Sequence, residues 1–224
     1  MALFLVESTI NEVSSKEAFS ALVEKVHATV GANVIEVQVA KDFSRGYFII
    51  EATDEVVATA ALTAQDVTAD LVKEVRLIGK ELDEVKNGGE QVNYLVEWEI
   101  PAEITMDKYL ERKKKNSVKY EEVPDVKFSR TYVCEDMTKC LCFYDAPDEA
   151  AVKRAREAVQ TPITSLTEQV RRLRITSFQP CSCLCRSNPV GMQQKYLQHT
   201  MKRYLIFNPP IPKIPTYKTH ISSN

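Results

Sequence analysis

Apolar and polar positions alternate along the first 80 residues in a way that predicts a short series of strands and helices. Residues 3–7 form an apolar run that predicts a strand, and the apolar residues of 19–26 recur at helical spacing. Alternating Val and Ile residues, a polar turn and a second apolar run predict a hairpin over 34–50. An alanine-containing helix over 54–62 and a strand over 71–78 complete the order βαββαβ.

The same pattern returns in the second part of the chain. Leu-Val-Glu at 5–7 recurs at 95–97, and residues 39–55 match residues 133–149 with their Asp, Ala and Asp-Glu positions in register. The offset between matching positions drifts from 90 to 95, and it changes where loops are expected. Because the matches also keep their order, they are typical of a duplicated domain.

The duplication predicts an α+β protein of two tandem ferredoxin-like (βαββαβ) domains, residues 1–80 and 92–176, joined by a linker over 81–91. Helices cover only one face of each four-stranded sheet, so the other apolar face needs a partner. We expect the two open faces to pack together as an intrachain version of a dimeric α/β barrel, in a monomer with an internal pseudo-twofold axis or in a homodimer. A cleft between the sheets is then the expected site for a ligand.

Composition and charge divide the chain near residue 177. The 224 residues carry a formal charge of −2, but all 31 acidic residues precede position 177, whereas six basic residues follow it. Six of the ten prolines also lie in 177–224, which predicts a disordered basic tail rich in Cys and Pro. The tail contains three cysteines at alternate positions, Cys181, Cys183 and Cys185, for which metal binding is the alternative interpretation.

Hydropathy and charge bear on location and partners. No segment approaches the roughly 18 apolar residues of a membrane span, and no basic region precedes the apolar residues of the N-terminus. The cysteines are absent before Cys134 and then cluster, unlike a disulfide framework. We therefore expect a cytoplasmic protein without a membrane partner. Nucleic acid is not an expected partner either, because the net charge is near zero and the basic run 111–115 is interpreted as a solvated helix face.

Three cysteines lie in a hairpin predicted over 128–144. Cys140 and Cys142 are two residues apart on a strand and share a face, and Cys134 lies opposite Cys140 if the turn has an odd number of residues. Converging thiols would allow a thiolate metal site or a reversible disulfide. The alternative is that all three are small buried residues of the strands, as free cysteines commonly are.

Five further residues are candidate ligand contacts if they point into the cleft between the sheets: Glu7, Glu97, Trp98, Arg130 and Tyr132. Glu7 and Glu97 lie at equivalent ends of two first strands, and Arg130 shares a strand face with Tyr132. A carboxylate, a guanidinium and a phenol can bind a polar ligand or act in general acid/base chemistry. The alternative is a structural ion pair for the charged residues and a place in the core for Trp98.

A series of residues in the second copy carries a likeness to a known family: Tyr94–Glu97, Thr131-Tyr132-Val133, Asp136, Cys142, Tyr144, Ala146–Glu149, Pro162-Ile163, Glu168 and Val170-Arg171. This copy resembles domain of unknown function 4242, a family of small proteins whose best-known members are nickel-binding ferredoxin-like dimers, and the first copy resembles it more weakly. The resemblance implies the fold and a transition metal such as nickel as cofactor. Two histidines of the family pattern are replaced by Arg130 and Ala155, which removes two ligands of a type that borderline metals prefer.

These patterns favour a protein that binds a small molecule or a metal ion in the cleft between the sheets, with nickel as the metal that the resemblance implies. The candidate metal ligands are the thiols Cys134, Cys140 and Cys142. One alternative is a cofactor-free enzyme of the dimeric α/β-barrel type, such as a cyclase, isomerase or monooxygenase, that would use Glu97, Arg130 and Tyr132. Another alternative is a non-catalytic interaction module.

Overall fold

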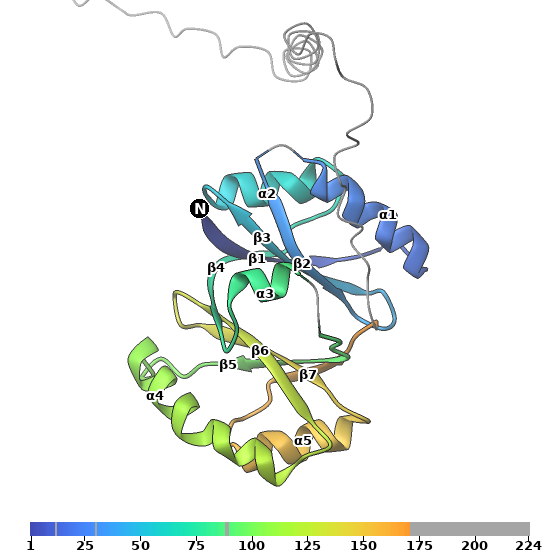
Figure 1. Ribbon diagram of the computed structural model, residues 1–224. Helices are drawn as coiled ribbons and strands as arrows, with labels where there is room; N and C mark the ends of the chain where they lie inside the picture. The colour runs from blue at the N-terminus through green and yellow to red at the C-terminus, as the bar shows by residue number, and fades with distance from the viewer. Residues whose placement is uncertain (12, 30, 88–89, 171–224) are drawn as a thin grey trace, which may run out of the picture. The chain divides into compact units, whose positions relative to one another are not determined.

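The computed structural model describes residues 1–11, 13–29, 31–87 and 90–170 (Figure 1). The predicted disordered tail, 177–224, and its three cysteines lie outside the described residues. None of the helices in the described part of the chain is long and apolar enough to cross a membrane.

The first half of the described chain has the order of elements that its hydrophobic pattern predicts. Ser15 caps the first helix by accepting a hydrogen bond from Ala18 N, and Asp54 caps the second by accepting from Val57 N. Both helices therefore begin where their capping residues predict. The elements are β1 (Ala2–Thr9), α1 (Lys16–His27), β2 (Asn33–Val39), β3 (Arg45–Ala52), α2 (Glu55–Thr63) and β4 (Leu71–Ile78).

The second half has the same order, with a 3-10 helix, η1, added after its first helix. Thr105 and Asp148 cap its two α-helices through side-chain oxygens, at the places that Ser15 and Asp54 occupy in the first half. The elements are β5 (Tyr94–Glu99), α4 (Met106–Asn116), η1 (Ser117–Glu122), β6 (Lys127–Cys134), β7 (Lys139–Asp145), α5 (Glu149–Ala158) and β8 (Ser165–Glu168).

The hairpin turns of the two halves have the same geometry. In each turn an aspartate accepts hydrogen bonds from the backbone N–H and the hydroxyl two residues later, from Ser44 to Asp42 and from Thr138 to Asp136. The residue between each pair has a positive φ, of 59° and 58°. The repeated Asp-x-Ser/Thr sequence thus produces the same turn twice.

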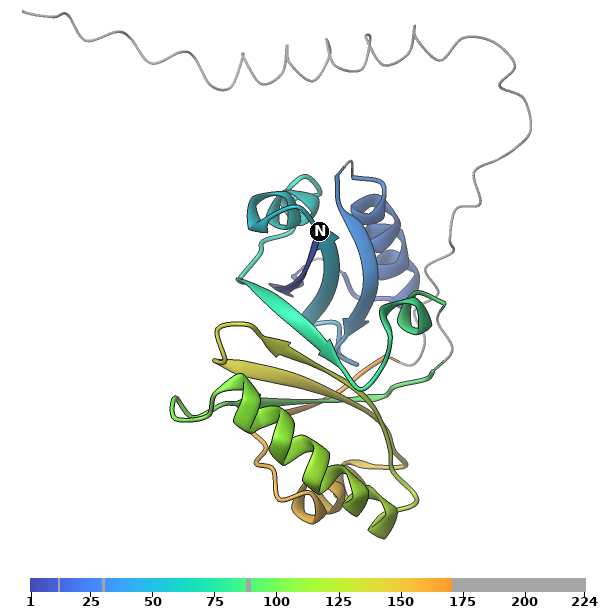
Figure 2. The ribbon, with the colours of Figure 1, turned by 60° about the vertical axis from the view of Figure 1, so that its left-hand side comes forward.

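The eight strands of the described residues form one antiparallel sheet in the order β2-β3-β1-β4-β6-β7-β5-β8, which confirms the predicted α+β class. Figure 2 shows the strands of the two halves meeting between their helices. The halves join where Val75–Ile78 of β4 pairs with β6. The outer edges also meet, because Lys41 N donates to Glu168 O and Val170 N donates to Val39 O, both at 2.9 Å. The two edges of the sheet therefore close on each other over a short stretch.

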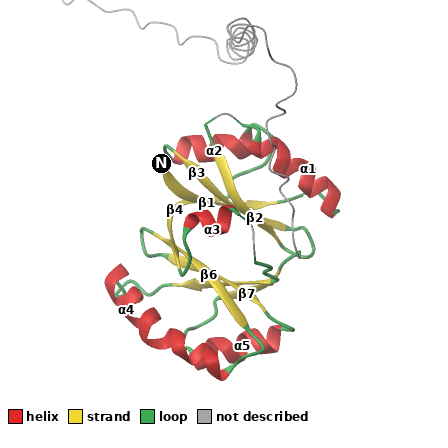
Figure 3. Ribbon diagram, viewed as in Figure 1, coloured by secondary structure: helices red, strands yellow, loops and turns green. Residues whose placement is uncertain are grey.

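Three clusters of buried side chains hold these layers together. Helices α1 and α2 cover the strands of the first half, and α4 and α5 cover those of the second half, each over its own apolar cluster (Figure 3). A third cluster lies between the two halves and contains Leu5, Leu95 and Tyr132. Successive strand residues serve opposite faces, since Leu5 lies in this inner cluster and Val6 lies under the helices.

A short helix, α3 (Leu82–Lys86), lies within the segment expected to be a linker. Its Leu82 and Val85 pack against the inner cluster, and Lys86 Nζ lies 3.2 Å from Glu51 Oε2 of β3. The connection between the halves therefore contributes apolar surface to the core that they share.

Candidate functional site

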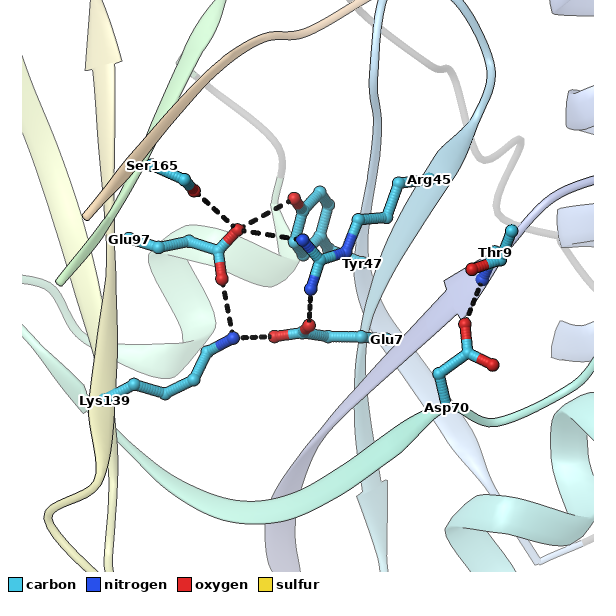
Figure 4. Close-up of polar contacts among 8 residues, drawn as sticks. All are labelled: Glu7, Thr9, Arg45, Tyr47, Asp70, Glu97, Lys139 and Ser165. Atoms are coloured by element: carbon cyan, nitrogen blue, oxygen red, sulfur yellow. Dashed lines mark hydrogen bonds and ion pairs between the residues drawn. The ribbon is translucent and has the colours of Figure 1, made fainter. Parts of the chain in front are cut away.

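Glu7 and Glu97, two of the expected ligand contacts, lie in a cluster of four charges that we call the four-charge cluster (Figure 4). Arg45 contacts both carboxylates, and its Nη1 lies 3.3 Å from Glu97 Oε1. Lys139 also contacts both, and its Nζ lies 2.6 Å from Glu97 Oε2. The Tyr47 hydroxyl donates to Glu97 Oε1 at 3.1 Å. Two cations thus neutralise two carboxylates. This arrangement corresponds to the alternative in which Glu7 and Glu97 form structural ion pairs and do not contact a ligand.

The charges of this cluster stabilise one another. Burial raises the pKa of the Glu97 carboxyl, but the hydrogen bond from Lys139 and the charge of Arg45 outweigh burial and leave that pKa below its ordinary value. Burial lowers the pKa of Lys139, but Glu7 and Glu97 raise it above its ordinary value. The shifts of Glu97 and Lys139 therefore favour the charged forms of both groups, unlike those of a general acid or base.

Arg130 and Tyr132 lie in a second polar cluster, around Glu36 of β2. Arg130 Nε donates to Glu36 Oε2 at 2.9 Å, its Nη2 donates to Oε1, and the Tyr132 hydroxyl donates to Oε2 at 2.9 Å. Gln38 Nε2 donates to Glu36 Oε1 at 2.8 Å. The side chains of Arg130 and Glu36 are 6% and 8% exposed. Glu97 is not part of this cluster, so the expected trio of Glu97, Arg130 and Tyr132 is not assembled in one place.

β-Bulges at the same place in both halves set the direction of the paired charges. The register shifts between Val34 and Glu36 in β2, and between Phe128 and Arg130 in β6. A bulge inserts one residue and turns the next side chain toward a new direction. Glu36 and Arg130 therefore hold corresponding positions in the two halves and pair with each other.

Large side chains fill the space between the halves, where a ligand cleft was expected. Leu5, Tyr47, Leu95, Tyr132 and Phe143 are each at most 1% exposed. The rings of Tyr132 and Phe143 meet edge to face with centroids 5.8 Å apart. Within the described residues this region is therefore a packed core that contains ion pairs, and the expected cleft is not found there.

The three strand cysteines do not converge as expected. Val133 stands opposite Cys140, so Cys134 points to the other face of its strand and joins the inner cluster, where burial raises its pKa to about 11. Cys140 and Cys142 share the helix-covered face, and their Sγ atoms are 3.9 Å apart. In the described ranges, no three His, Cys, Asp or Glu side chains come together as a metal site.

A pocket lies on the helix-covered side of the second half, and we call it the α4 pocket because α4 and η1 line one wall. Its enclosed volume is about 40 Å³. Trp98 borders it and is the one expected ligand contact that does so. The lining contains no acidic side chain. It consists of four aromatic residues, three cations and five smaller groups: Trp98, Tyr109, Tyr120, Phe128, Arg112, Lys113, Arg156, Asn116, Ser117, Cys142, Val159 and Thr161.

A chain of hydrogen bonds connects the pocket cations to Cys142. Lys113 Nζ donates to Thr131 Oγ1 at 2.8 Å, and Thr131 Oγ1 donates to Cys142 Sγ at 3.3 Å. On the other side, Arg156 Nη1 lies 3.4 Å from Cys142 Sγ and 3.2 Å from the Tyr144 hydroxyl. Two cationic side chains thus reach one sulfur, one directly and one through a hydroxyl.

These contacts change the protonation of the pocket residues. The hydrogen bond from Cys140 and the charges of Arg156 and Lys113 outweigh burial and hold the pKa of the Cys142 thiol well below its usual range. The pKa of Cys140 is raised well above that range, by its interaction with Cys142 and by burial. Burial lowers the pKa of the Lys113 ammonium. Of the two thiols, Cys142 is therefore the one whose surroundings favour a thiolate, because Arg156 and the Thr131 hydroxyl contact its sulfur.

Arg156 is 3% exposed, and its Nε atom has no hydrogen-bond partner among the described residues. Its other nitrogens contact a sulfur, a phenol and the carbonyl of Pro162. Neither Arg156 nor Lys113 forms an ion pair with a carboxylate of the described part of the chain. Buried cations without a carboxylate are unusual, because burying an uncompensated charge is costly.

The first half has apolar residues at the corresponding positions. Phe48 is the counterpart of Cys142. It pairs with residues of β1 and β2 that correspond to those of β5 and β6 with which Cys142 pairs. Counted from the helix caps, Val23 and Leu62 stand where the second half has Lys113 and Arg156. These three residues belong to the apolar cluster of the first half. The polar pocket is therefore a feature of the second half that the fold itself does not require.

Lys113 and Arg156 were not identified from the sequence, although helical spacing contained the information. Lys113 was interpreted as part of a solvated face, yet it follows the buried Tyr109 by four residues and so shares its side of α4. Arg156 lies four residues after the buried Val152 on α5. A cation at an apolar position of an amphipathic helix would have been the signal.

Three solved structures are similar in fold. A protein assigned as a chlorite dismutase, TA0507, is 14% identical, with a TM-score of 0.48 over 75% of this chain and 93% of its own. A protein from Lactobacillus acidophilus NCFM assigned as a monooxygenase is 11% identical, with a TM-score of 0.43 over 76% of this chain and 94% of its own. Another protein assigned as a monooxygenase, from Fusobacterium nucleatum, is 8% identical, with a TM-score of 0.39 over 77% and 97%. Similarity at this level concerns the fold alone.

No curated protein sequence matches the chain. A family model does match part of it, and the matched part contains the strands and helices that surround the α4 pocket. The match agrees with the likeness of the second copy to a nickel-binding ferredoxin-like family. Residues 94–168 are similar to the family described as "Nickel responsive protein SCO4226-like".

Proposed function

We propose that this protein binds a small anionic molecule whose acidic group enters the α4 pocket. One observation carries the proposal. Two cationic side chains, the buried Arg156 and the half-buried Lys113, line the same pocket, and neither has a carboxylate partner in the described part of the chain. An anion would supply the missing charge and a hydrogen-bond acceptor for Arg156 Nε.

The charge balance favours an anion even when Cys142 is a thiolate. Arg112, Lys113 and Arg156 contribute three cations to the lining, against a single sulfur anion. Burying an uncompensated ion costs several kcal/mol, and a bound carboxylate or phosphate would offset part of that cost. The lowered pKa of Lys113 reflects the same desolvation, and an anion beside the ammonium would raise it again.

The size of the pocket limits what enters it. One water molecule needs roughly 10–15 Å³ of such space, so an enclosed volume of about 40 Å³ accommodates a group of two or three heavy atoms, such as a carboxylate. Trp98 and Phe128 lie in the lining beside the cations, with Arg112 over the Trp98 ring and Lys113 over the Phe128 ring, so the apolar part of a ligand would meet aromatic groups next to the charges. An aromatic carboxylate combines both features, and benzoate is the simplest probe of this class.

A fluorescence titration tests the proposal, because Trp98 is the only tryptophan and borders the pocket. Benzoate is expected to change the Trp98 emission saturably, whereas benzamide, which has the same shape without the charge, is not. Arg156→Gln should weaken benzoate binding by roughly tenfold or more. The matched control is Arg154→Gln on the same helix, because Arg154 is exposed and pairs with Asp125.

Equal responses to benzoate and benzamide would contradict an anion site, as would no saturation by roughly 10 mM benzoate. Lys113→Gln tests the other wall of the pocket and should also weaken benzoate binding. Its control is Lys114→Gln, because the neighbouring Lys114 is exposed. Thermal unfolding of every variant separates loss of the site from loss of the fold.

Nickel, which the matched family suggests, does not fit the residues of this pocket. Its lining offers one thiol, Cys142, with Cys140 Sγ 3.9 Å away outside the lining and no histidine in the lining, and Arg156 and Lys113 would repel a divalent cation. The family's histidine positions hold Arg130, which pairs with Glu36, and Ala155. Nickel chloride is therefore expected to leave the Trp98 emission unchanged. Stoichiometric nickel binding that depends on Cys142 would favour a metal protein instead.

We also propose that the two halves are tandem ferredoxin-like repeats that reproduce a dimeric α/β barrel within one chain. The matching caps, hairpin turns and bulges support this proposal. One edge of each half is used within the chain, because β4 pairs with β6, and the other two edges meet at residues 39–41 and 168–170. Light scattering should then give the mass of a monomer, 25.4 kDa, and a stable dimer would contradict it.

A further inference from the structure

We propose that Cys142 and Cys140 form a redox pair in which a small hydroperoxide oxidises Cys142 and Cys140 then closes a disulfide with it. The proposal concerns the α4 pocket but does not require that an anion is bound there. It assigns a chemical activity to two thiols that the proposed binding function leaves unused.

The surroundings of Cys142 are those of a nucleophilic sulfur. Arg156 Nη1 lies 3.4 Å from its Sγ, and the Thr131 hydroxyl donates to it from 3.3 Å. Lys113 holds that hydroxyl in place from 2.8 Å. A guanidinium and a hydroxyl donor stabilise a thiolate, in agreement with the lowered pKa of Cys142, and the thiolate is the form that attacks peroxides.

Access to Cys142 is selective. The residue is 2% exposed, but it lines the α4 pocket, whose enclosed volume of about 40 Å³ accommodates a molecule of two heavy atoms such as hydrogen peroxide. A bulky disulfide such as oxidised glutathione does not fit this volume. Cys134 lies in the inner cluster and does not line the pocket, so it serves as an internal reference.

The first step is a two-electron oxidation of sulfur. The Cys142 thiolate attacks one oxygen of hydrogen peroxide, an S–O bond forms and the O–O bond breaks. The leaving hydroxide takes a proton and departs as water, and Cys142 becomes a sulfenic acid. The Lys113 ammonium is the nearest proton donor of lowered pKa, and it lies one hydroxyl away from the sulfur.

The second step uses Cys140, whose Sγ lies 3.9 Å from that of Cys142. The Cys140 sulfur attacks the sulfenic sulfur, an S–S bond forms, and the hydroxyl group leaves with the Cys140 proton as water. A disulfide between alternate residues of one strand departs from the usual geometry, and such strained disulfides are readily reduced. An external dithiol then restores both thiols.

Peptide mapping of the full-length reduced protein after hydrogen peroxide treatment tests the pair. Trypsin cleaves after Arg130, Lys139 and Lys153, so Cys134 falls in residues 131–139 and the pair falls in residues 140–153. The tail cysteines fall in a third peptide, residues 175–186. We expect the 140–153 peptide to lose two hydrogens while the 131–139 peptide stays reduced.

Variants assign the two steps. In Cys140→Ser the sulfenic acid on Cys142 should accumulate and be trapped by dimedone, whereas Cys142→Ser should leave Cys140 reduced. Arg156→Gln should slow the oxidation of Cys142 by roughly tenfold or more, and Arg154→Gln should not. Protein unfolded in urea is the reference for a variant that folds poorly, because all thiols are then equally accessible.

Several outcomes would overturn the redox pair. They are oxidation of Cys134 as fast as Cys142 in the folded protein, an unchanged rate in Arg156→Gln, and equal rates for Cys142 in folded and unfolded protein. The assay contains no benzoate, and Cys140→Ser, which is outside the pocket lining, should still bind benzoate. Failure of the redox pair is therefore distinguishable from failure of the proposed anion binding.

Discussion

Arg130→Met removes one partner of the buried ion pair between the two halves and leaves Glu36 without its cation. Both side chains are less than 10% exposed, and the pair is bidentate, with Nε 2.9 Å from Glu36 Oε2. After the change, the carboxylate keeps the hydrogen bonds from Tyr132 and Gln38 but no opposite charge. Breaking a buried pair in this way typically costs about 3–5 kcal/mol.

A second substitution shows how much of the cost of Arg130→Met comes from the unpaired charge of Glu36. The cost comes mainly from the uncompensated carboxylate, so Glu36→Gln in the Arg130→Met background removes the charge and retains an acceptor for the Tyr132 hydroxyl. The double variant should therefore recover about 2 kcal/mol or more of the stability that the single variant loses. Arg154→Met is the matched control, because the exposed pair of Arg154 with Asp125 is worth less than about 1 kcal/mol.

Urea unfolding followed by the emission of Trp98 measures these differences, with circular dichroism as a second probe of the same transition. For a domain of this size, a loss of 3–5 kcal/mol lowers the melting temperature by roughly 6–20 °C. The reasoning is refuted if Arg130→Met loses less than about 1 kcal/mol. It is also refuted if Glu36→Gln does not restore stability to Arg130→Met.

Three further predictions concern charges and caps. Lys139→Met should lower the free energy of unfolding by about 3–5 kcal/mol at pH 7. This deficit should shrink as the pH falls, because the pKa of Glu97 rises when its cation is lost. A deficit in urea unfolding that is the same at pH 5 and pH 7 would contradict this prediction. Burial raises the pKa of Glu90, but hydrogen bonds from lysines and a serine outweigh it and hold that pKa at about 2. The Glu90 carboxylate therefore stabilises the folded protein above pH 4.5, and this contribution should be lost as the pH falls from 4.5 toward 2. Glu90→Gln should not show that loss. Parallel acid titrations of the two proteins by circular dichroism measure the difference, and curves of the same shape would count against it. Asp148→Ala should lower the free energy of unfolding in urea by about 1 kcal/mol, because Asp148 Oδ1 accepts from Ala151 N at 2.7 Å at the start of α5. No measurable loss of stability would show that the cap is dispensable.

The strand cysteines illustrate a limit of sequence reasoning. Because strand residues alternate between faces, the prediction that Cys140 and Cys142 share a face needed only their spacing, and the structure agrees. The direction of Cys134 depended on the turn, and the register that pairs Val133 with Cys140 turned it to the opposite face. A change of one residue in register reverses every side chain of a strand, and the sequence alone did not specify that count.

The polar residues illustrate a second limit. Glu97 and Arg130 were grouped into one expected site on the condition that both point into the cleft between the sheets. The structure instead joins Glu97 to Arg45 and Lys139, and Arg130 to Glu36. Arg45 and Glu36 come from the other half of the chain than the residues they pair with, and bulges direct Glu36 and Arg130. Such pairing depends on how the two halves of the sheet pack against each other, for which no local pattern exists.

The sequence by itself determined the twofold βαββαβ order, although not α3 or η1, together with the helix starts at their capping residues and the repeated hairpin turn, because neighbouring residues and hydrophobic period decide these features. Only the tertiary structure decided that the space between the halves is a core and that the pocket lies under α4. Lys113 and Arg156 meet beside Cys142 from two helices and a strand. Their proximity is a property of packing between elements, and it gives the second half a chemistry that the first half lacks.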